Sequence, residues 1–214
     1  VKRVPRLVGG YPERSGYYSR IRFIARRAAW VWAPSSLTVA DLGRRFGVAA
    51  DRVAYCFDSD RFRPGEWSRS LPHRILAVSR LVPHKNHAAL IRAAARLDPK
   101  PQVHLIGQGP EGPALLALAR ELRVDLRLDQ DWQSDDAIAS AYRGATVVVS
   151  PSRFEGFGLT PMEGVASGIP TVASDIPPHR EHLGEAVTYF DLEDDRSLVE
   201  AMRTAVERGP ADPG

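Results

Sequence analysis

After about residue 71 the sequence alternates between short apolar runs and segments whose apolar residues recur with helical spacing. The expected strands cover residues 74–79, 102–106, 124–128, 145–150, 170–173 and 186–190. The expected helices cover residues 86–97, 112–122, 134–143, 160–167, 178–183 and 195–208. Such alternation is typical of a parallel sheet with helices on both faces. We therefore predict an α/β fold with a Rossmann-like, doubly wound parallel sheet.

The first 70 residues follow a different pattern. Helical spacing runs over residues 16–33 and 36–46, and a short strand is expected at 52–56. Turn-forming Pro, Gly and Ser residues then indicate a domain boundary at 65–72.

The chain is therefore divided into three parts. Residues 1–70 are the end of one domain with its linker, residues 71–208 are the sheet domain, and residues 209–214 are a tail. At 214 residues the sequence holds one full domain, or one and a fraction.

Composition narrows the setting. The single cysteine, Cys56, excludes an internal disulfide and suits a reducing cytoplasm. No apolar run approaches the roughly 18 residues of a membrane span. The amino end, Val1–Pro5, has neither an initiator Met nor the apolar core of a signal peptide, so we expect a processed chain or a fragment in the cytoplasm.

Charge is distributed unevenly along the chain. Residues 1–70 contain 14 Lys and Arg against 6 Asp and Glu, whereas residues 71–214 contain 15 against 20. The aromatic residues of the basic part form no stacking motif, so we expect no nucleic-acid partner. A solvated basic surface is the simpler interpretation, and peripheral contact with the inner face of an anionic membrane is the alternative.

Two carboxylates flank a glycine turn after the apolar run 145–149. Glu155 comes six residues after that run. Glu163 follows eight residues later in Thr160-Pro161-x-Glu163, which reads as an N-cap, a first-turn proline and a capping-box glutamate. Both acids are therefore expected at the carboxyl edge of the sheet, where open α/β sheets bind ligands.

The turn between these acids suits a ligand with both phosphate and hydroxyl groups. Backbone N–H groups at a helix start bind phosphate, and carboxylates accept hydrogen bonds from hydroxyls. The pattern therefore predicts a nucleotide-sugar site that includes the turn residues Gly156, Phe157, Gly158 and Leu159. Two simpler interpretations stay open, in which Glu163 only caps its helix and Phe157 only anchors the core.

Arg80 and Lys85 lie on the loop after the first strand of the sheet domain, at the same predicted edge. The chain has only three lysines beside 26 arginines, so a lysine at this position is notable. Two cations in a cleft of low dielectric constant would stabilise the negative charge of a departing diphosphate. The alternative is an ordinary surface pair on a strand–helix loop.

A literal G-x-G-x-x-G spans Gly107, Gly109 and Gly112, with Asp129 about 20 residues further on. This spelling suggests a dinucleotide-binding fingerprint. That fingerprint belongs to the first strand–helix turn, however, and Pro110 disturbs the helix start that it requires. We expect instead that Gly107 and Gly109 border a nucleotide.

These segments together resemble glycosyltransferase family 4, the retaining GT-B glycosyltransferases, mainly in its C-terminal, donor-binding domain. Glu155 and Glu163 are similar to the E-x7-E signature of that family. Four other segments resemble its motifs in family order: Asp58–Pro64, Arg80–Lys85, Leu105–Glu111 and Asp175–Glu181.

The resemblance implies a specific set of roles. Arg80 and Lys85 would stabilise the departing diphosphate, Glu155 would contact the donor sugar, and Glu163 would bind the ribose. It also implies transfer of a sugar from a UDP-, GDP- or ADP-sugar to a hydroxyl of a sugar or lipid-linked acceptor, with retention of configuration. Residues 1–70 would be the end of the acceptor domain, so we expect a partial enzyme that binds nucleotide but transfers sugar poorly.

Alternatives to an enzyme with this activity remain at this point. The chain could be a nucleotide-sugar-binding module without catalysis, or a GT-B sugar-nucleotide epimerase. No carboxylate cluster indicates a metal, and we expect no cofactor. His179 and His182 lie three residues apart without a third ligand and are expected at the surface.

Overall fold

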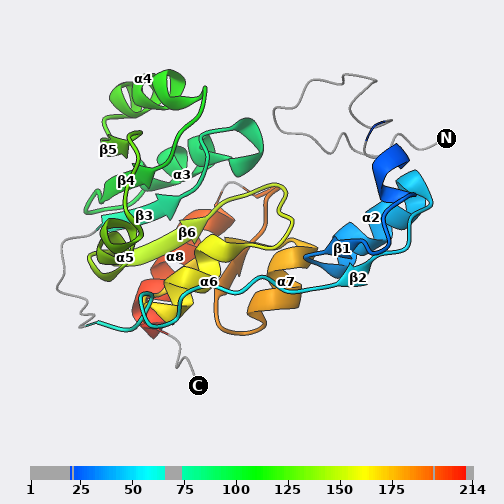
Figure 1. Cartoon of the computed structure of the whole chain (residues 1–214). Helices are drawn as coiled ribbons and strands as arrows, with labels where there is room; N and C mark the ends of the chain where they lie inside the picture. Colours follow the sequence, from blue (N-terminus) through cyan, green and yellow to red (C-terminus); the bar gives the residue numbers. More distant parts are fainter. Residues whose placement is uncertain (1–19, 21, 66–73, 195, 211–214) are drawn as a thin grey trace.

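The computed structural model describes residues 20, 22–65, 74–194 and 196–210. Its main body is a sheet of six parallel strands flanked by helices (Figure 1). The strands are β3 (Arg74–Val78), β4 (Gln102–Ile106), β5 (Asp125–Asp129), β6 (Val147–Ser150), β7 (Thr171–Ser174) and β8 (Thr188–Phe190). The helices are the short 3₁₀ helix η1 (Pro83–Lys85) and α3 (His87–Ala94), α4 (Gly112–Leu122), α5 (Asp135–Arg143), α6 (Leu159–Ala166), α7 (Pro177–Leu183) and α8 (Ser197–Arg208).

The strand order is β5-β4-β3-β6-β7-β8, so the first strand of the sheet lies at its centre. The chain winds outward through β4 and β5 and then returns to the other side of β3 with β6. This is the doubly wound arrangement predicted from the alternation of strands and helices. The winding direction reverses between β3 and β6, and open sheets bind ligands at the carboxyl ends of such strands.

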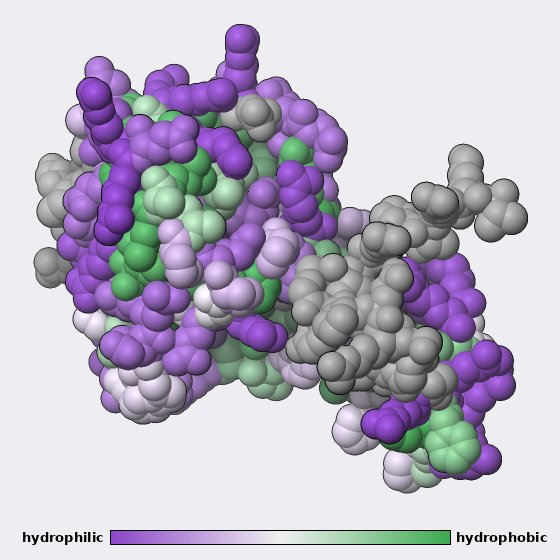
Figure 2. Space-filling view, turned by 90° about the horizontal axis from the view of Figure 1, so that it is seen from above, coloured by the Kyte–Doolittle hydropathy of each residue, from purple (hydrophilic) through white to green (hydrophobic). Residues whose placement is uncertain are grey.

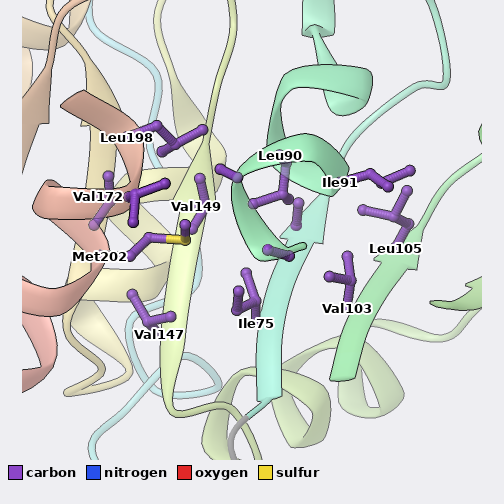
Figure 3. Packing of buried hydrophobic residues seen from close by; sticks show 14 of the residues in the cluster. Ile75, Leu90, Ile91, Val103, Leu105, Val147, Val149, Val172, Leu198 and Met202 are labelled. Carbon is purple, nitrogen blue, oxygen red and sulfur yellow. The ribbon is translucent and has the colours of Figure 1, made fainter. Parts of the chain in front are cut away.

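Alternate residues along each strand point to opposite faces, and each face has its own helices. Ile75, Val147 and Val149 pack in one cluster with residues of α3, α4 and α8 (Figure 3). Leu76 and Val148 belong to a second cluster with residues of α5 on the other face. Burial on both faces explains why β6 is an unbroken apolar run.

A smaller part precedes this body. Strand β1 (Trp32–Ala33) pairs in parallel with β2 (Asp51–Arg52), and helix α2 (Ser36–Phe46) connects them. The Ser35 side chain caps α2, and Gly47 ends it in the left-handed conformation. This part lies beside α7 in Figure 1, and Figure 2 shows it projecting from a main body whose visible face is largely hydrophilic.

Several boundaries differ from those predicted. Residues 16–19 and 21 of the expected helix 16–33 lie outside the described residues. Residues 22–25 are helical as expected, but the last two residues of the range form β1, where Ala33 is buried. The strand expected at 52–56 is only β2, because β1 offers it two partners and one further bond, from Val53 N–H to the Ala33 carbonyl. Most of the predicted boundary at 65–72 lies outside the described residues.

No helix in the described part of the chain combines the length and the apolar character needed to cross a membrane.

Candidate functional site

An ion pair joins the loops that follow β3 and β6. Lys85 Nζ lies 2.5 Å from Glu155 Oε1, and the two side chains are 16% and 13% exposed. A backbone bond of 2.8 Å from Arg153 N–H to the His84 carbonyl ties the same loops together. The two charges therefore meet at the reversal point of the sheet, as the shared sheet edge predicts.

Ser152 also holds Glu155, which the sequence reasoning missed. Its hydroxyl donates to Glu155 Oε1 over 2.7 Å, so Ser152 and Lys85 contact the same carboxylate oxygen. Ser152 is only 2% exposed. It is the second residue after β6 and follows Pro151. A serine that follows a buried strand and lies three residues before an acid could have predicted this contact from the sequence.

Arg80 lies on the loop after β3, with an exposed side chain. The neighbouring residue Leu81 fixes this loop by two backbone bonds: its N–H donates to the Gln108 carbonyl over 2.8 Å, and its carbonyl accepts from Glu111 N–H over 3.1 Å. The buried His87 ring lies 3.0 Å from the Ser79 hydroxyl on the same loop. The backbone that carries Arg80 is thus held from two sides.

Gly107 and Gly109 permit the close approach of these loops. A Cβ at Gly107 would overlap the Ser79 carbonyl oxygen, and one at Gly109 would overlap the Leu81 carbonyl. The glycine turn follows β4, the second strand of the sheet, so it does not occupy the position of a dinucleotide fingerprint. The close approach of the loops explains why glycine stands at both positions, and the contact of Gly107 and Gly109 with a nucleotide stays a prediction.

The turn before α6 differs from the predicted capping box. The helix begins at Leu159 with Gly158 as its N-cap at a φ of 100°, a conformation that favours glycine. The His179 ring fills the space beside it, since a Cβ at Gly158 would lie 2.9 Å from His179 Cδ2. Thr160 is inside the helix, and its hydroxyl donates to the Val78 carbonyl at the end of β3 over 2.6 Å.

Glu163 consequently does not turn back to cap its own helix. It accepts a hydrogen bond of 2.8 Å from the hydroxyl of Tyr142, a fully buried residue of α5. Burial raises the pKa of Glu163, although the Tyr142 bond opposes the rise. Burial and the nearby Glu163 also raise the pKa of Tyr142 well above its usual value. The capping-box interpretation is wrong, and Glu163 is a half-buried carboxylate held from a neighbouring helix.

Phe157 anchors the glycine turn. It is 4% exposed, with its ring centroid 4.1 Å from that of His182 and 5.3 Å from that of Tyr55. Gly156 faces Pro34 of the smaller part, and Leu159 is 36% exposed. The alternative of a packing role thus has direct geometric support for the Phe157 side chain.

The expectation of a surface position is wrong for His179. Its side chain is fully buried, and Nδ1 lies 2.9 Å from the Ser174 carbonyl oxygen. Because a carbonyl only accepts, Nδ1 carries the proton. Burial lowers the pKa of His179. The ring is therefore neutral near pH 7 and serves packing and hydrogen bonding within the fold.

Residues 59–212 match the family described as Glycosyl transferases group 1, which covers more than half of the chain. A D-inositol 3-phosphate glycosyltransferase from Frankia alni is 35% identical over 64% of this chain and 39% of its own length. An MMP alpha-(1->4)-mannosyltransferase from Mycolicibacterium hassiacum is 30% identical over 74% of this chain and 40% of its own length. The chain thus spans about 40% of the length of these curated relatives.

Solved structures show the same fold. Sucrose-phosphate synthase from Thermosynechococcus elongatus superposes with a TM-score of 0.78 at 21% identity, over 93% of this chain and 53% of that one. Anabaena HepE in complex with UDP and glucose superposes with a TM-score of 0.77 at 18% identity, over 92% of this chain and 58% of that one. The predicted resemblance to GT-B glycosyltransferases is confirmed, and the chain belongs to the Glycosyl transferases group 1 family.

Proposed function

We propose that this chain is the donor-binding part of a glycosyltransferase that moves a sugar from a nucleotide diphosphate sugar to an acceptor hydroxyl with retention of configuration. The assignment to family 4 is part of the same proposal. The observation that carries it is the Lys85–Glu155 pair, which lies at the reversal point between β3 and β6 within the family-matching residues.

Arg80 and Lys85 would bind the diphosphate. Breaking the glycosidic bond leaves extra negative charge on that group, and fixed cations stabilise such charge most where water is scarce. Lys85 has three N–H donors and uses one toward Glu155. The remaining donors are suited to phosphate oxygens, so one lysine would link the departing group to the acid that holds the sugar.

Glu155 and Glu163 would bind hydroxyl groups of the donor. Among the described residues, Lys85 and Ser152 both bind Glu155 through Oε1, which leaves Oε2 for a sugar hydroxyl. Glu163, steadied by Tyr142, would accept from the ribose. Backbone N–H groups of the turn 156–159 would face phosphate or sugar, and Gly107 and Gly109 would border the nucleotide.

The acceptor would be a sugar or a lipid-linked sugar, contacted in part by residues of the segment 1–70. In this proposal residues 71–208 are the donor domain, the nucleotide sugar is a substrate, and no cofactor or metal is required. The basic charge of residues 1–70 suits work in the cytoplasm at the inner membrane face. Because this chain spans about 40% of the length of these relatives, we expect it to bind nucleotide but to transfer sugar poorly on its own.

Calorimetric titration with UDP-, GDP- and ADP-sugars tests the binding step. We expect one nucleotide class to bind, and Lys85→Ala to weaken binding at least tenfold through loss of a charge-assisted hydrogen bond. Lys100→Ala is the matched control, because in the described part of the chain the Lys100 ammonium donates to the carbonyls of Leu122 and Arg123, away from the Lys85–Glu155 pair. Absence of binding across the whole panel would contradict the proposal.

Transfer is tested separately. Adding an acceptor domain from a relative should restore sugar transfer, and the product should keep the anomeric configuration of the donor. NMR of the product measures this configuration. Binding without transfer in that assembly would favour a binding module, and change of the donor without any acceptor would favour an epimerase.

A further inference from the structure

Three buried residues connect the Glu155 carboxylate to the interior of the domain. The His179 Nδ1–H donates to the Ser174 carbonyl over 2.9 Å, and the Ser174 hydroxyl donates to the Ser152 carbonyl over 2.6 Å. The Ser152 hydroxyl then donates to Glu155 Oε1 over 2.7 Å. Ser152, Ser174 and His179 are 2%, 0% and 0% exposed.

The direction of these bonds is fixed by chemistry. Carbonyl oxygens only accept, so the proton of each hydroxyl or ring nitrogen is committed. The Ser174 hydroxyl must point to Ser152, and the Ser152 hydroxyl is the donor to an ionised carboxylate. A bond of this charge-assisted kind is roughly twice as strong as one between neutral groups.

The arrangement also determines which oxygen of Glu155 is engaged. Ser152 and Lys85 approach Oε1 together, which orients the carboxylate plane and directs neither donor to Oε2. Lys85 alone is a flexible point charge that allows several carboxylate orientations. Ser152 is a short, buried donor whose backbone carbonyl is held by Ser174. It therefore restricts the Glu155 carboxylate to one orientation.

We propose that Ser152 is a positioning residue, backed by Ser174, that holds Glu155 with one oxygen free for a hydroxyl of the donor sugar. This inference rests on the proposed function. It assigns to Ser152 an effect on sugar recognition that acts only through Glu155, and it leaves the nucleotide contacts untouched.

The test compares two ligands on each variant by calorimetry: the nucleotide sugar that the unmodified chain binds, and the matching nucleoside diphosphate. For Ser152→Ala we expect about tenfold weaker binding of the nucleotide sugar, by loss of a hydrogen bond to a charged group. Binding of the nucleoside diphosphate should change less than twofold. Ser174→Ala should shift the nucleotide sugar in the same direction by a smaller factor.

Ser167→Ala is the matched control. Ser167 is fully buried at the end of α6, and its hydroxyl has no hydrogen-bond partner among the described residues, so the same atom is removed without loss of a bond seen in the structure. A second arm repeats Ser152→Ala in a Glu155→Gln background, where it should have little further effect if it acts through Glu155.

The proposal is overturned by equal losses for both ligands, by no loss for either, or by an equal loss in Ser167→Ala. Thermal unfolding of each variant accompanies the titrations. If the Ser152→Ala chain fails to fold, Ser152→Cys is used in its place, because cysteine has a similar volume and a weaker donor. If the unmodified chain binds neither ligand, the proposed function itself fails, an outcome distinct from an unaffected Ser152 variant.

Discussion

The Glu181 carboxylate on α7 caps Ser36 at the start of α2, although the two residues are 145 positions apart. The Ser36 N–H lies 2.9 Å from Oε2 and 3.1 Å from Oε1, and the Ser36 hydroxyl donates to Oε1 over 2.9 Å. Arg52 of β2 adds an ion pair of 3.3 Å. One acid thus fastens the smaller part to the sheet domain and satisfies a free helix N–H.

Glu181→Ala should therefore weaken the attachment of α2. Loss of a helix cap costs about 1 kcal/mol, and we expect a reduction of this size in the free energy of unfolding, measured with urea. Glu185→Ala, an exposed acid close by in the chain, should change it little. Equal effects of the two substitutions would show that the cap contributes nothing.

Gly107→Ala should disrupt the site more than any surface change. The new Cβ would overlap the Ser79 carbonyl, so the loop that carries Arg80 must move. We expect a loss of at least about 3 kcal/mol, within the range of severe core substitutions, by thermal unfolding. Gly43→Ala is the control, because its Cβ meets nothing nearer than 4.0 Å inside α2, and alanine should stabilise that helix by up to about 1 kcal/mol.

His87 should make stability depend on pH. Burial lowers the pKa of His87 from 6.5 to about 4. The unfolded chain therefore takes up a proton near pH 6.5, which the folded chain refuses until about pH 4. The stability present above pH 6.5 should fall by about 3 kcal/mol as the pH drops toward 4.

Urea unfolding of the unmodified chain and of His87→Gln across this pH range checks the assignment. The difference between the two curves isolates His87 from other titrating groups. A difference that does not vary with pH would remove His87 as the cause.

Tyr142 and Glu163 should be energetically coupled. Tyr142→Phe removes the donor to a half-buried carboxylate, and Glu163→Gln removes its charge. We expect the double variant to be more stable than the sum of the single losses implies, by about 0.5–3 kcal/mol. Chemical denaturation of the four proteins in the cycle measures this, and strict additivity would mean that the 2.8 Å contact carries no energy.

The sequence predicted the sheet domain well because its signals are local. Apolar runs such as β6 and the turn residues between elements mark strands and helices without reference to distant residues. Since all strands are parallel, their carboxyl ends share one edge, so the meeting of Lys85 and Glu155 followed from the same pattern.

The errors occur where distant groups compete for a side chain. Thr160 and Glu163 spell a capping box, but the Val78 carbonyl and the Tyr142 hydroxyl, 82 and 21 positions away, bind them instead. His179 has a polar side chain typical of the surface, yet its ring is buried because it packs against Gly158, which has no side chain.

The amino-acid sequence by itself determined the order of elements, the winding of the sheet and the edge at which the charged residues gather, because periodicity and turn chemistry act over a few residues. Only the tertiary structure decided which atoms bind which, as in the choice of Glu155 Oε1 by both Ser152 and Lys85. Such choices depend on distances between segments that are far apart in the chain, and no local pattern encodes them.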